Sequence, residues 1–426
     1  MAIPHRHPVS AHLRFLSQVI ASAPQIYWLT EEFFPPQIGG VEIMVSLLSQ
    51  GLAKRGLGTR VITRQTVPPS PAAETIGTVS VRRIPPSGQI KGAGWQAIVR
   101  MLGYLSRLTR LLVSDRSQYD LVIVSGMKII PLVAVPVCRL LGKRCVVRVE
   151  STFELQEPLS AKSRGEMRLL GAWLQHSLAR LQRAALRAAD RVIAISPEVE
   201  QLLRATVPRA RIVTIPNAVD ALRFSPAIPE RKHELRRRLA LPHDRTLLLY
   251  IGRLSRAKGV AMLVQAAPQL LAHDPQLCLV IVGSGKGSFD DCETEIIDFV
   301  SAQRLESDVL MYPATDQVPD YLQAADLCVF PSDYEGFGVG LIEALATGTP
   351  VISTPVGIAR ELLRNGETGF LFPTRNAAAL VGAVEAALAA RSIWSEIGRR
   401  AREAIQPYEL DSIVMRYEQL CRELRV

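Results

Sequence analysis

The feature that most constrains this fold is a series of short, continuously apolar segments separated by helical stretches. The segments do not alternate between apolar and polar residues, so both faces of each predicted strand must be covered. A parallel sheet with helices on both faces meets this requirement. The first set comprises Gln25–Thr30, Arg60–Arg64, Val79–Ile84, Leu121–Ser125, Cys145–Glu150, Arg191–Ser196 and Arg211–Pro216, and the second comprises Thr246–Gly252, Leu277–Gly283, Val309–Tyr312, Leu327–Pro331, Val351–Thr354 and Phe370–Phe372. Two such sets predict two successive doubly wound α/β domains.

The length of 426 residues agrees with two domains of ordinary size. We expect an N-terminal leader over residues 1–23, a first Rossmann-like domain over 24–217 and a second over 245–406. Residues 218–244 are rich in proline and charge, with a strongly basic helical piece at Arg231–Leu239, which is typical of an interdomain linker. Residues 407–426 form an amphipathic helix that could pack in any apolar groove.

Charge is distributed unevenly along the chain. Residues 1–217 carry 28 Lys and Arg against 13 Asp and Glu, whereas residues 218–426 carry 22 against 27, which gives +15 and −5. A basic domain of this kind indicates an anionic partner such as lipid headgroups or nucleic acid. The sequence contains no nucleic-acid recognition motif, so we expect no nucleic-acid partner.

Cysteine usage and the N-terminus bear on the compartment. The six cysteines have neither metal-ligand spacing nor the density of a disulfide scaffold, which favours a reducing compartment. The apolar stretch Leu13–Ala23 is short and contains Arg14 and Gln18, so we predict neither a signal peptide nor a membrane-spanning helix.

Two glutamates eight residues apart mark the most informative segment. A buried strand, Leu327–Pro331, runs into the loop Asp333–Gly340, with Glu335 in the loop and Glu343 about one turn into the next helix. The loop glycines allow backbone amides to approach a ligand, and a helix N-terminus attracts phosphate. Carboxylates beside a phosphate site make sense when the ligand also offers hydroxyl groups, as a nucleotide sugar does. An acidic loop before a solvated glutamate is the alternative for the two glutamates alone.

The loop after the strand Thr246–Gly252 places two cations, Arg253 and Lys258, at the carboxyl end of the predicted sheet. No Asp-x-Asp motif is present in a matching loop to hold a divalent metal. We therefore expect no metal and no cofactor, and expect these two side chains to stabilise a departing diphosphate. Solvated surface charge is the alternative interpretation.

Two glycine turns add weaker signals. Gly39 and Gly40 follow the first strand, where a nucleotide-binding domain places a tight turn before a helix, although a plain turn is equally compatible. Gly283, in Val282-Gly-Ser-Gly285, begins a strand-to-helix turn that could border a nucleotide.

Together these segments resemble glycosyltransferase family 4, whose members have the GT-B fold, are retaining, and carry a Glu-x7-Glu motif, here Glu335 to Glu343. The resemblance covers the chain from about Gln25 onward. It implies that Glu335 binds the donor hexose, Glu343 the ribose hydroxyls, and Arg253 with Lys258 the diphosphate. It further implies a lining of the donor site by backbone groups, at Gly39, Gly40, Gly252, Gly283, Gly336, Phe337, Gly338, Val339 and Gly340.

The chain departs from the family pattern at two places. Many members have a histidine at the end of a first-domain strand, pointing at the reacting sugar, whereas Val147–Ser151 places Glu150 or Ser151 there. Glu150 is thus the candidate catalytic residue of the first domain. Near the base-binding turn, Pro313 stands where members usually have glycine, and proline removes one backbone donor.

The sequence therefore predicts a retaining, metal-independent glycosyltransferase that moves a hexose from a UDP- or GDP-linked sugar to a hydroxyl of a glycan or lipid-linked acceptor. We expect it in the cytoplasm, where the amphipathic, arginine-containing stretches Trp95–Leu112 and Glu166–Ala189 either pack on their own sheet or dock on an anionic membrane. The alternatives are another GT-B enzyme, such as an epimerase or a phosphorylase, and a non-catalytic nucleotide-sugar binder.

Overall fold

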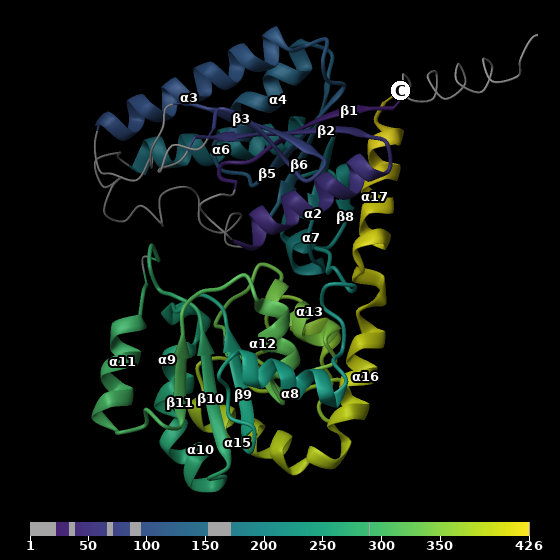
Figure 1. Cartoon of the computed structure of the whole chain (residues 1–426). Coiled ribbons are helices and arrows are strands. Elements are labelled where there is room, and N and C mark those ends of the chain that lie inside the picture. Colours follow the sequence, from purple (N-terminus) through teal and green to yellow (C-terminus); the bar gives the residue numbers. More distant parts are fainter. Residues whose placement is uncertain are drawn as a thin grey trace, which may run out of the picture. The chain divides into compact units, whose positions relative to one another are not determined.

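The computed structural model describes residues 23–33, 39–65, 71–85, 95–151, 172–288 and 290–425, which form two compact units (Figure 1). The first unit comprises Met1–Pro216 with Asp411–Val426, and the second comprises Asn217–Leu410. Each unit has its own sheet, so the prediction of two parallel-sheet α/β domains is confirmed.

The first unit alternates strands and helices. In chain order its elements are β1 (Gln25–Leu29), α2 (Gly40–Lys54), β2 (Gly58–Arg64), β3 (Ala73–Ile76), β4 (Val79–Ile84), α3 (Trp95–Ser114), β5 (Leu121–Ser125), α4 (Ile130–Leu140), β6 (Arg144–Val149), α6 (Ala172–Ala188), β7 (Arg191–Ala194), α7 (Pro197–Arg204), β8 (Ile212–Thr214) and α17 (Leu410–Glu423).

The sheet of the first unit has the order β3-β4-β2-β1-β5-β6-β7-β8, and every pair is parallel except β3 with β4. The order reverses at β1, which pairs with β2 on one side and β5 on the other. Open α/β sheets bind ligands at the carboxyl ends of the strands beside such a reversal. In this unit the loops after β1 and β5 occupy that place.

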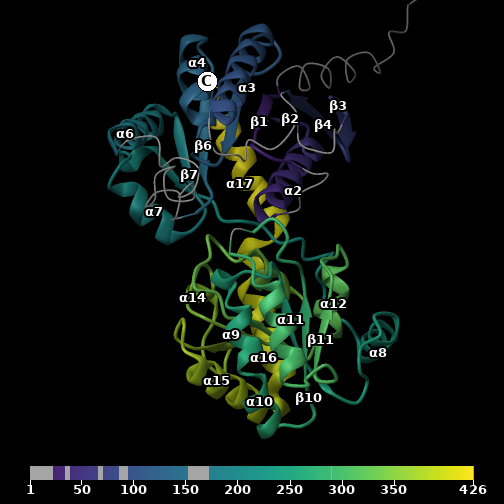
Figure 2. The same ribbon diagram turned by 90° about the vertical axis from the view of Figure 1, so that its left-hand side faces the viewer.

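The C-terminal helix α17 packs against α2 within the first unit (Figure 2). A Cβ atom on Gly51 of α2 would lie 2.4 Å from Cγ2 of Val414, so the glycine is what allows the two helices to come this close. Arg55 adds an ion pair to Glu418 at 3.3 Å.

The second unit follows the same plan. Its elements are α8 (Pro229–Arg238), β9 (Thr246–Ile251), α9 (Val260–Gln265), α10 (Ala267–His273), β10 (Leu277–Val282), α11 (Glu293–Ala302), β11 (Val309–Tyr312), α12 (Val318–Ala324), β12 (Leu327–Phe330), α13 (Val339–Ala346), β13 (Val351–Ser353), α14 (Ala359–Leu362), β14 (Phe370–Leu371), α15 (Ala377–Ala389) and α16 (Trp394–Ala404). The sheet order β11-β10-β9-β12-β13-β14 is parallel throughout and reverses at β9.

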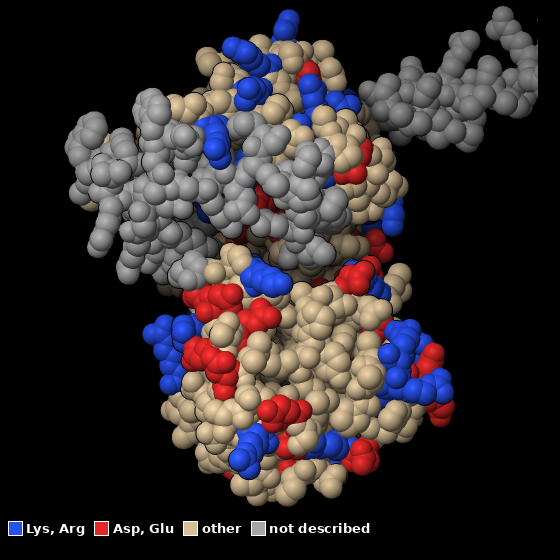
Figure 3. All heavy atoms as spheres, turned by 60° about the vertical axis from the view of Figure 1, so that its left-hand side comes forward, with Lys and Arg blue, Asp and Glu red and all other residues tan. Residues whose placement is uncertain are grey.

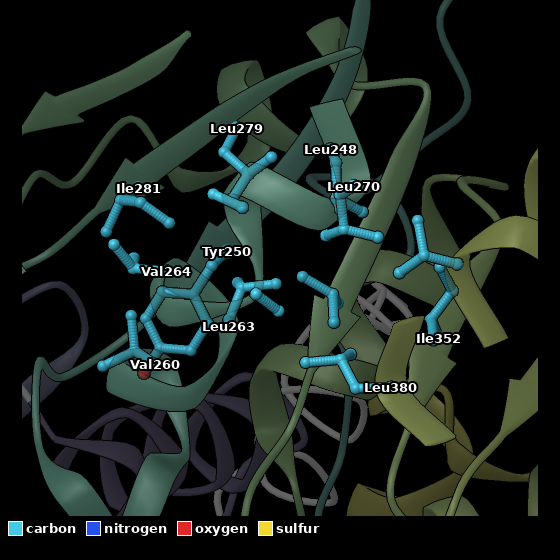
Figure 4. Close-up of a cluster of buried hydrophobic side chains, with 14 of the residues drawn as sticks. Leu248, Tyr250, Val260, Leu263, Val264, Leu270, Leu279, Ile281, Ile352 and Leu380 are labelled. Carbon is cyan, nitrogen blue, oxygen red and sulfur yellow. The ribbon is translucent and has the colours of Figure 1, made fainter. Parts of the chain in front are cut away.

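Apolar side chains on both faces explain why the strand segments of the second unit read as continuous runs. Figure 4 shows one face, where Leu248 and Tyr250 of β9 and Leu279 and Ile281 of β10 pack against α9. The intervening residues of both strands face the other way and are also buried. This core fixes the strand ends from which the loops of the candidate site begin.

The expected domain boundaries differ from the observed units in two places. The segment 218–244 was expected to be a linker, but it lies within the second unit. There Asp326, just before β12, accepts from Lys232 of α8 at 2.7 Å and from Arg236 at 2.6 Å. The basic composition of α8 thus reflects docking through ion pairs. The expected C-terminal segment 407–426 is divided, because the chain passes from the second unit into the first between Leu410 and Asp411.

Three further observations concern cysteines, metals and membranes. All six cysteines are buried and free. Among the residues that the structure describes, no group of three or more His, Cys, Asp or Glu side chains could hold a metal ion. No single helix in the same residues is long and apolar enough to cross a membrane, although a bent pair, Ala377–Ala389 with Arg391–Ala404, passes a test of length and composition.

Candidate functional site

The candidate donor site lies in the second unit, where the loops after β9 and β12 flank the reversal of strand order. Asp333 donates its backbone N–H to the carbonyl of Ala257 at 2.9 Å, which ties the two loops together. Gly259 has a φ of +70°, and a Cβ atom there would lie 2.0 Å from the carbonyl oxygen of Pro331. Only glycine fits both this backbone conformation and this approach.

Lys258 and Glu335 meet at this point. The Lys258 ammonium donates to Oε2 of Glu335 at 2.7 Å, and the Ser332 hydroxyl donates to Oε1 at 2.9 Å. Both carboxylate oxygens are therefore oriented by side chains from the two tied loops. Lys258 and Glu335, which the family resemblance assigns to separate groups of the donor, are thus direct partners, and a diphosphate would share the Lys258 ammonium with Glu335.

Arg253 is exposed just after β9. Its carbonyl accepts from the Tyr250 hydroxyl at 2.6 Å, which anchors the backbone at that residue. The ion pairs found among the described residues do not include the Arg253 guanidinium, so it is available to an anion. Burial raises the pKa of Asp290, but hydrogen bonds and, to a smaller extent, the positive charge of Arg253 lower it, and the net pKa is lowered.

Gly252 and Gly283 bring the loops after β9 and β10 into contact. A Cβ atom on Gly283 would lie 1.9 Å from the carbonyl oxygen of Gly252. The next residues are held by Glu293 at the start of α11, whose Oε2 accepts from the Ser284 hydroxyl at 2.9 Å and from the Gly285 N–H at 2.7 Å. Hydrogen bonds to Glu293 therefore fix the backbone of this turn.

The conformation and packing of the loop before α13 also depend on its glycines. Gly338 has a φ of +100° and caps α13, while a Cβ atom on Gly340 would lie 3.3 Å from the Phe330 ring. The carbonyl of Phe337 accepts from the N–H of Ile358 at 2.7 Å, and the Phe337 ring lies 6.2 Å from that of Tyr408. Gly336 and Val339 lie in the same loop and at the first position of α13, respectively.

Glu343, in α13, is a partly buried carboxyl group. Burial raises its pKa to about 8, against the opposing effect of Arg223. Arg223 was not identified from the sequence. Its own guanidinium donates to the carbonyl of Asp316, in the loop after β11, at 3.0 Å. No sequence signal distinguishes Arg223 from the other exposed arginines, because Asp316 and Glu343, the residues it interacts with, lie 93 and 120 positions away in the sequence.

In the first unit, Gly39 is the N-cap of α2 and Gly40 is its first residue. Glu42, the third residue of the helix, folds back so that its carboxylate meets the backbone N–H of Gly39, as the glutamate of a capping box does. A Cβ atom on Gly39 would lie 2.4 Å from Oε2 of Glu42. Burial raises the pKa of Glu42, and the nearby Glu32 and Glu150 carboxylates raise it further.

Glu150 follows β6, and its side chain is 7% exposed. It forms an ion pair with Arg148, whose side chain is fully buried. Burial raises the pKa of Glu150, while the charge of Arg148 and a hydrogen bond from Ser125 lower it. The Glu150 side chain is therefore oriented by Arg148 and Ser125 at the carboxyl edge of the first sheet. Ser151, the other candidate at this place, is the last described residue before 172.

Two family profiles together cover most of the chain. Residues 231–404 match the profile described as Glycosyl transferases group 1, and residues 39–218 match the Glycosyl transferase 4-like domain. A D-inositol 3-phosphate glycosyltransferase 1 of Catenulispora acidiphila is 30% identical over 347 residues, which is 78% of each chain. The chain belongs to glycosyltransferase family 4.

Solved structures agree with the GT-B fold of this family 4 glycosyltransferase. Sucrose-phosphate synthase from Thermosynechococcus elongatus superposes with a TM-score of 0.76 at 26% identity, covering 94% of this chain and 99% of that one. Anabaena Alr3699/HepE in complex with UDP-glucose has a TM-score of 0.73 at 18% identity, covering 94% and 100%, and shows the fold alone. The enzyme is thus a glycosyltransferase.

Proposed function

We propose that this family 4 enzyme is retaining and metal-independent, and that it moves a hexose from a UDP- or GDP-linked sugar to a hydroxyl of a glycan or lipid-linked acceptor in cell-surface polysaccharide or glycolipid synthesis. The observation that carries the proposal is the Lys258–Glu335 pair, held between two tied loops at the switch point of the second sheet. It offers a cation for phosphate and an oriented carboxylate for hydroxyls in one place.

In the proposed step, the acceptor oxygen forms a bond to the anomeric carbon while the bond from that carbon to the diphosphate oxygen breaks. The electron pair leaves on the diphosphate, and the acceptor proton passes to the departing phosphate oxygen. Arg253 and Lys258 would stabilise the growing negative charge, which is the role a divalent cation has elsewhere. No protein nucleophile takes part, so catalysis depends on positioning and electrostatics.

The remaining donor contacts follow from the same loops. Glu335 would accept hydroxyl hydrogen bonds from the hexose, and Glu343 would accept them from the ribose. The backbone at Gly252, Gly283 and 336–340 would line the phosphates and sugar. In the first unit, Gly39 and Gly40 would contribute to the diphosphate site and Glu150 would contact the reacting sugar. UDP-glucose, which Anabaena Alr3699/HepE binds, is one candidate donor.

We also propose a cytoplasmic enzyme that docks on an anionic membrane through its first unit. The helices α3, α4 and α6 pack side by side and contain no Asp or Glu. Their arginines are Arg100, Arg107, Arg110, Arg139, Arg180, Arg183 and Arg187. Several apolar side chains on them are exposed, including Leu102, Val113 and Leu140. Figure 3 shows Lys and Arg side chains close together on this unit, with few acidic ones among them. Such a face suits anionic headgroups.

Thermal unfolding with UDP, GDP or ADP and no added metal tests the donor site. The expected result is that one diphosphate raises the midpoint of the wild type but of neither Arg253→Ala nor Glu343→Ala. Ligand at a hundred times its Kd adds about 2.7 kcal/mol to the stability of the state that binds it. Arg237→Ala and Glu306→Ala, exposed positions in the same unit, should respond like the wild type. A wild type that responds to no diphosphate at millimolar concentration contradicts the proposal.

Product analysis then tests the reaction type. Transfer from the matching sugar nucleotide to a lipid-linked or glycan acceptor should proceed in EDTA and retain the anomeric configuration. Conversion of the sugar nucleotide without an acceptor would favour the epimerase alternative, and activity with free phosphate would favour a phosphorylase. Binding without turnover on any acceptor would favour a non-catalytic binder.

A further inference from the structure

The first unit contains a buried polar cluster that the donor chemistry does not explain. Arg148 projects from β6, a strand buried along most of its length, and its guanidinium contacts Oε1 of Glu150. Burying a guanidinium costs several kcal/mol, and the ion pair with Glu150 offsets part of that cost. Replacement of such a pair by apolar residues is often neutral for stability, so stability alone does not explain why a chain has one.

A second strand also orients Glu150. Ser125 ends β5, which pairs with β6, and a hydrogen bond from its hydroxyl favours the ionised form of Glu150. The Ser125 oxygen in turn accepts from the indole nitrogen of Trp28, on β1, at 2.9 Å. Three neighbouring strands of the sheet therefore contribute to the setting of one carboxylate.

The helix α17 closes the cluster from another element. Tyr417 is fully buried, with its ring 5.7 Å from that of Trp28 and its phenol beside the Arg148 guanidinium. The helix is fixed on both sides of this residue: Val414 fits against Gly51, and Arg55 pairs with Glu418. The C-terminal helix thus fixes the position of Tyr417, whose phenol lies beside the Arg148 guanidinium.

Glu150 lies where a ligand of this fold would be reached. It follows β6 at the carboxyl edge of the sheet. Its negative charge raises the pKa of Glu42, whose side chain folds back on Gly39. The turn at Gly39 follows β1, beside the reversal of strand order at which α/β folds bind ligands. The cluster therefore extends from α17 to the ligand-binding edge of the first unit.

We propose that Arg148 and Tyr417 are positioning residues that hold the Glu150 carboxylate for contact with the transferred sugar, so that the C-terminal helix completes the first unit's part of the site. The proposal rests on the proposed function. It assigns a role in the reaction to a helix that lies outside both family matches, which cover residues 39–218 and 231–404.

If Glu150 accepts hydrogen bonds from the sugar, sugar binding should depend on pH, and the groups around Glu150 determine the direction of that dependence. Within the part of the chain that the structure describes, the charged or titratable groups facing Glu150 include Arg148 of β6, Glu42 of α2 and Tyr417 of α17. Burial raises the pKa of Glu150 and Arg148 opposes the rise. Because the ionised carboxylate is the form that accepts hydroxyl hydrogen bonds, loss of the Arg148 charge moves the onset of sugar binding to higher pH.

Calorimetric binding separates contact with the sugar from contact with the nucleotide. The probes are UDP with UDP-glucose, and GDP with GDP-mannose. In Glu150→Gln we expect the Kd of the diphosphate to stay within about twofold and that of the sugar nucleotide to rise about tenfold, the loss of one hydrogen bond to a charged group. Tyr417→Phe, which removes a single oxygen, should show the same selective loss at about threefold.

Arg148→Met should move the acidic limb of sugar-nucleotide binding upward, and Arg148→Lys should restore it in part. Tyr104→Phe removes another fully buried phenol oxygen of the first unit and should bind both probes as the wild type does. If Arg148→Met does not fold, the conservative Tyr417→Phe still decides the question.

Wild-type Kd values for both probes in Tyr417→Phe, together with an unmoved acidic limb in a folded Arg148→Met, overturn the inference while the proposed function stands. Equal weakening of the diphosphate and the sugar nucleotide also overturns it, because that result indicates a structural role. A wild type that binds neither pair of probes removes the proposed function and the inference with it.

Discussion

Glu343 allows a quantitative prediction because its carboxyl group is destabilised by burial. Its pKa is raised from 4.5 to about 8. A carboxyl group whose pKa is higher in the folded than in the unfolded state lowers the free energy of unfolding as pH rises between those two values. The wild type should thus lose stability from about pH 4.5 to pH 8, and the loss is complete above pH 8.

Glu343→Gln removes this penalty while keeping the shape of the side chain. At pH 7 the difference spans about 2.5 pKa units, so the variant should be more stable by about 3 kcal/mol. At pH 5 the difference should be under about 1 kcal/mol. At the same time the variant should lose its response to a nucleoside diphosphate, because an amide accepts fewer hydroxyl hydrogen bonds than a carboxylate does.

Urea unfolding at pH 5, 7 and 9 measures the first effect, and thermal shift with UDP or GDP measures the second. The matched control is Glu306→Gln, an exposed glutamate of the same unit, for which we expect no change at any pH. A stability gain that does not grow between pH 5 and pH 8 would refute the argument from burial. A variant that still responds to the diphosphate would refute the ribose role.

Three further predictions concern the same unit. Gly259→Ala should lower the free energy of unfolding by about 2 kcal/mol or more, because the added Cβ meets the carbonyl of Pro331. The control is Gly366→Ala, at a φ of +73° with no atom near the added Cβ, which should cost only about 1 kcal/mol of backbone strain. Equal losses in urea unfolding would contradict the close approach to Pro331. Lys258→Met should reduce the turnover of the sugar nucleotide more than tenfold, because it removes the ammonium group that stabilises the departing diphosphate and leaves Glu335 without that ion pair. Unchanged initial rates would exclude a role for Lys258 in stabilising the leaving group. EDTA should leave initial rates of transfer unchanged, and recovery of lost activity by Mg²⁺ or Mn²⁺ would show a metal requirement.

The sequence predicted the fold because doubly wound sheets leave a strong local signal. Segments such as Leu277–Gly283 are continuously apolar for the physical reason that helices cover both faces of β10. The family was also recognisable, since Glu335, Glu343 and the glycines between them lie within one short stretch of chain. These features need no knowledge of contacts between distant segments.

The interactions that the sequence did not predict all join residues far apart in the chain. The basic helix α8 was interpreted as part of a linker because Asp320 and Asp326, which neutralise it, lie about 90 residues later. The amphipathic pattern of α17 predicted a helix but not its place, because Gly51 shows no local reason to accept Val414. The pairing of Lys258 with Glu335 likewise depends on two loops that meet only in the folded sheet.

Arg223, which lies outside every motif, should control the pH at which the donor binds. Its positive charge opposes the rise of the Glu343 pKa, so Arg223→Ala should raise that pKa above about 8. If ribose binding requires the Glu343 carboxylate, each further unit of pKa costs about 1.4 kcal/mol of binding at neutral pH, a tenfold weaker Kd. The loss should disappear near pH 9 to 10, where the carboxyl group ionises in both proteins. Calorimetric Kd values of the diphosphate against pH test this, with Arg237→Ala as the control. Since Arg223 also donates to the Asp316 carbonyl, a loss of affinity that is equal at every pH would assign the residue to holding that loop instead.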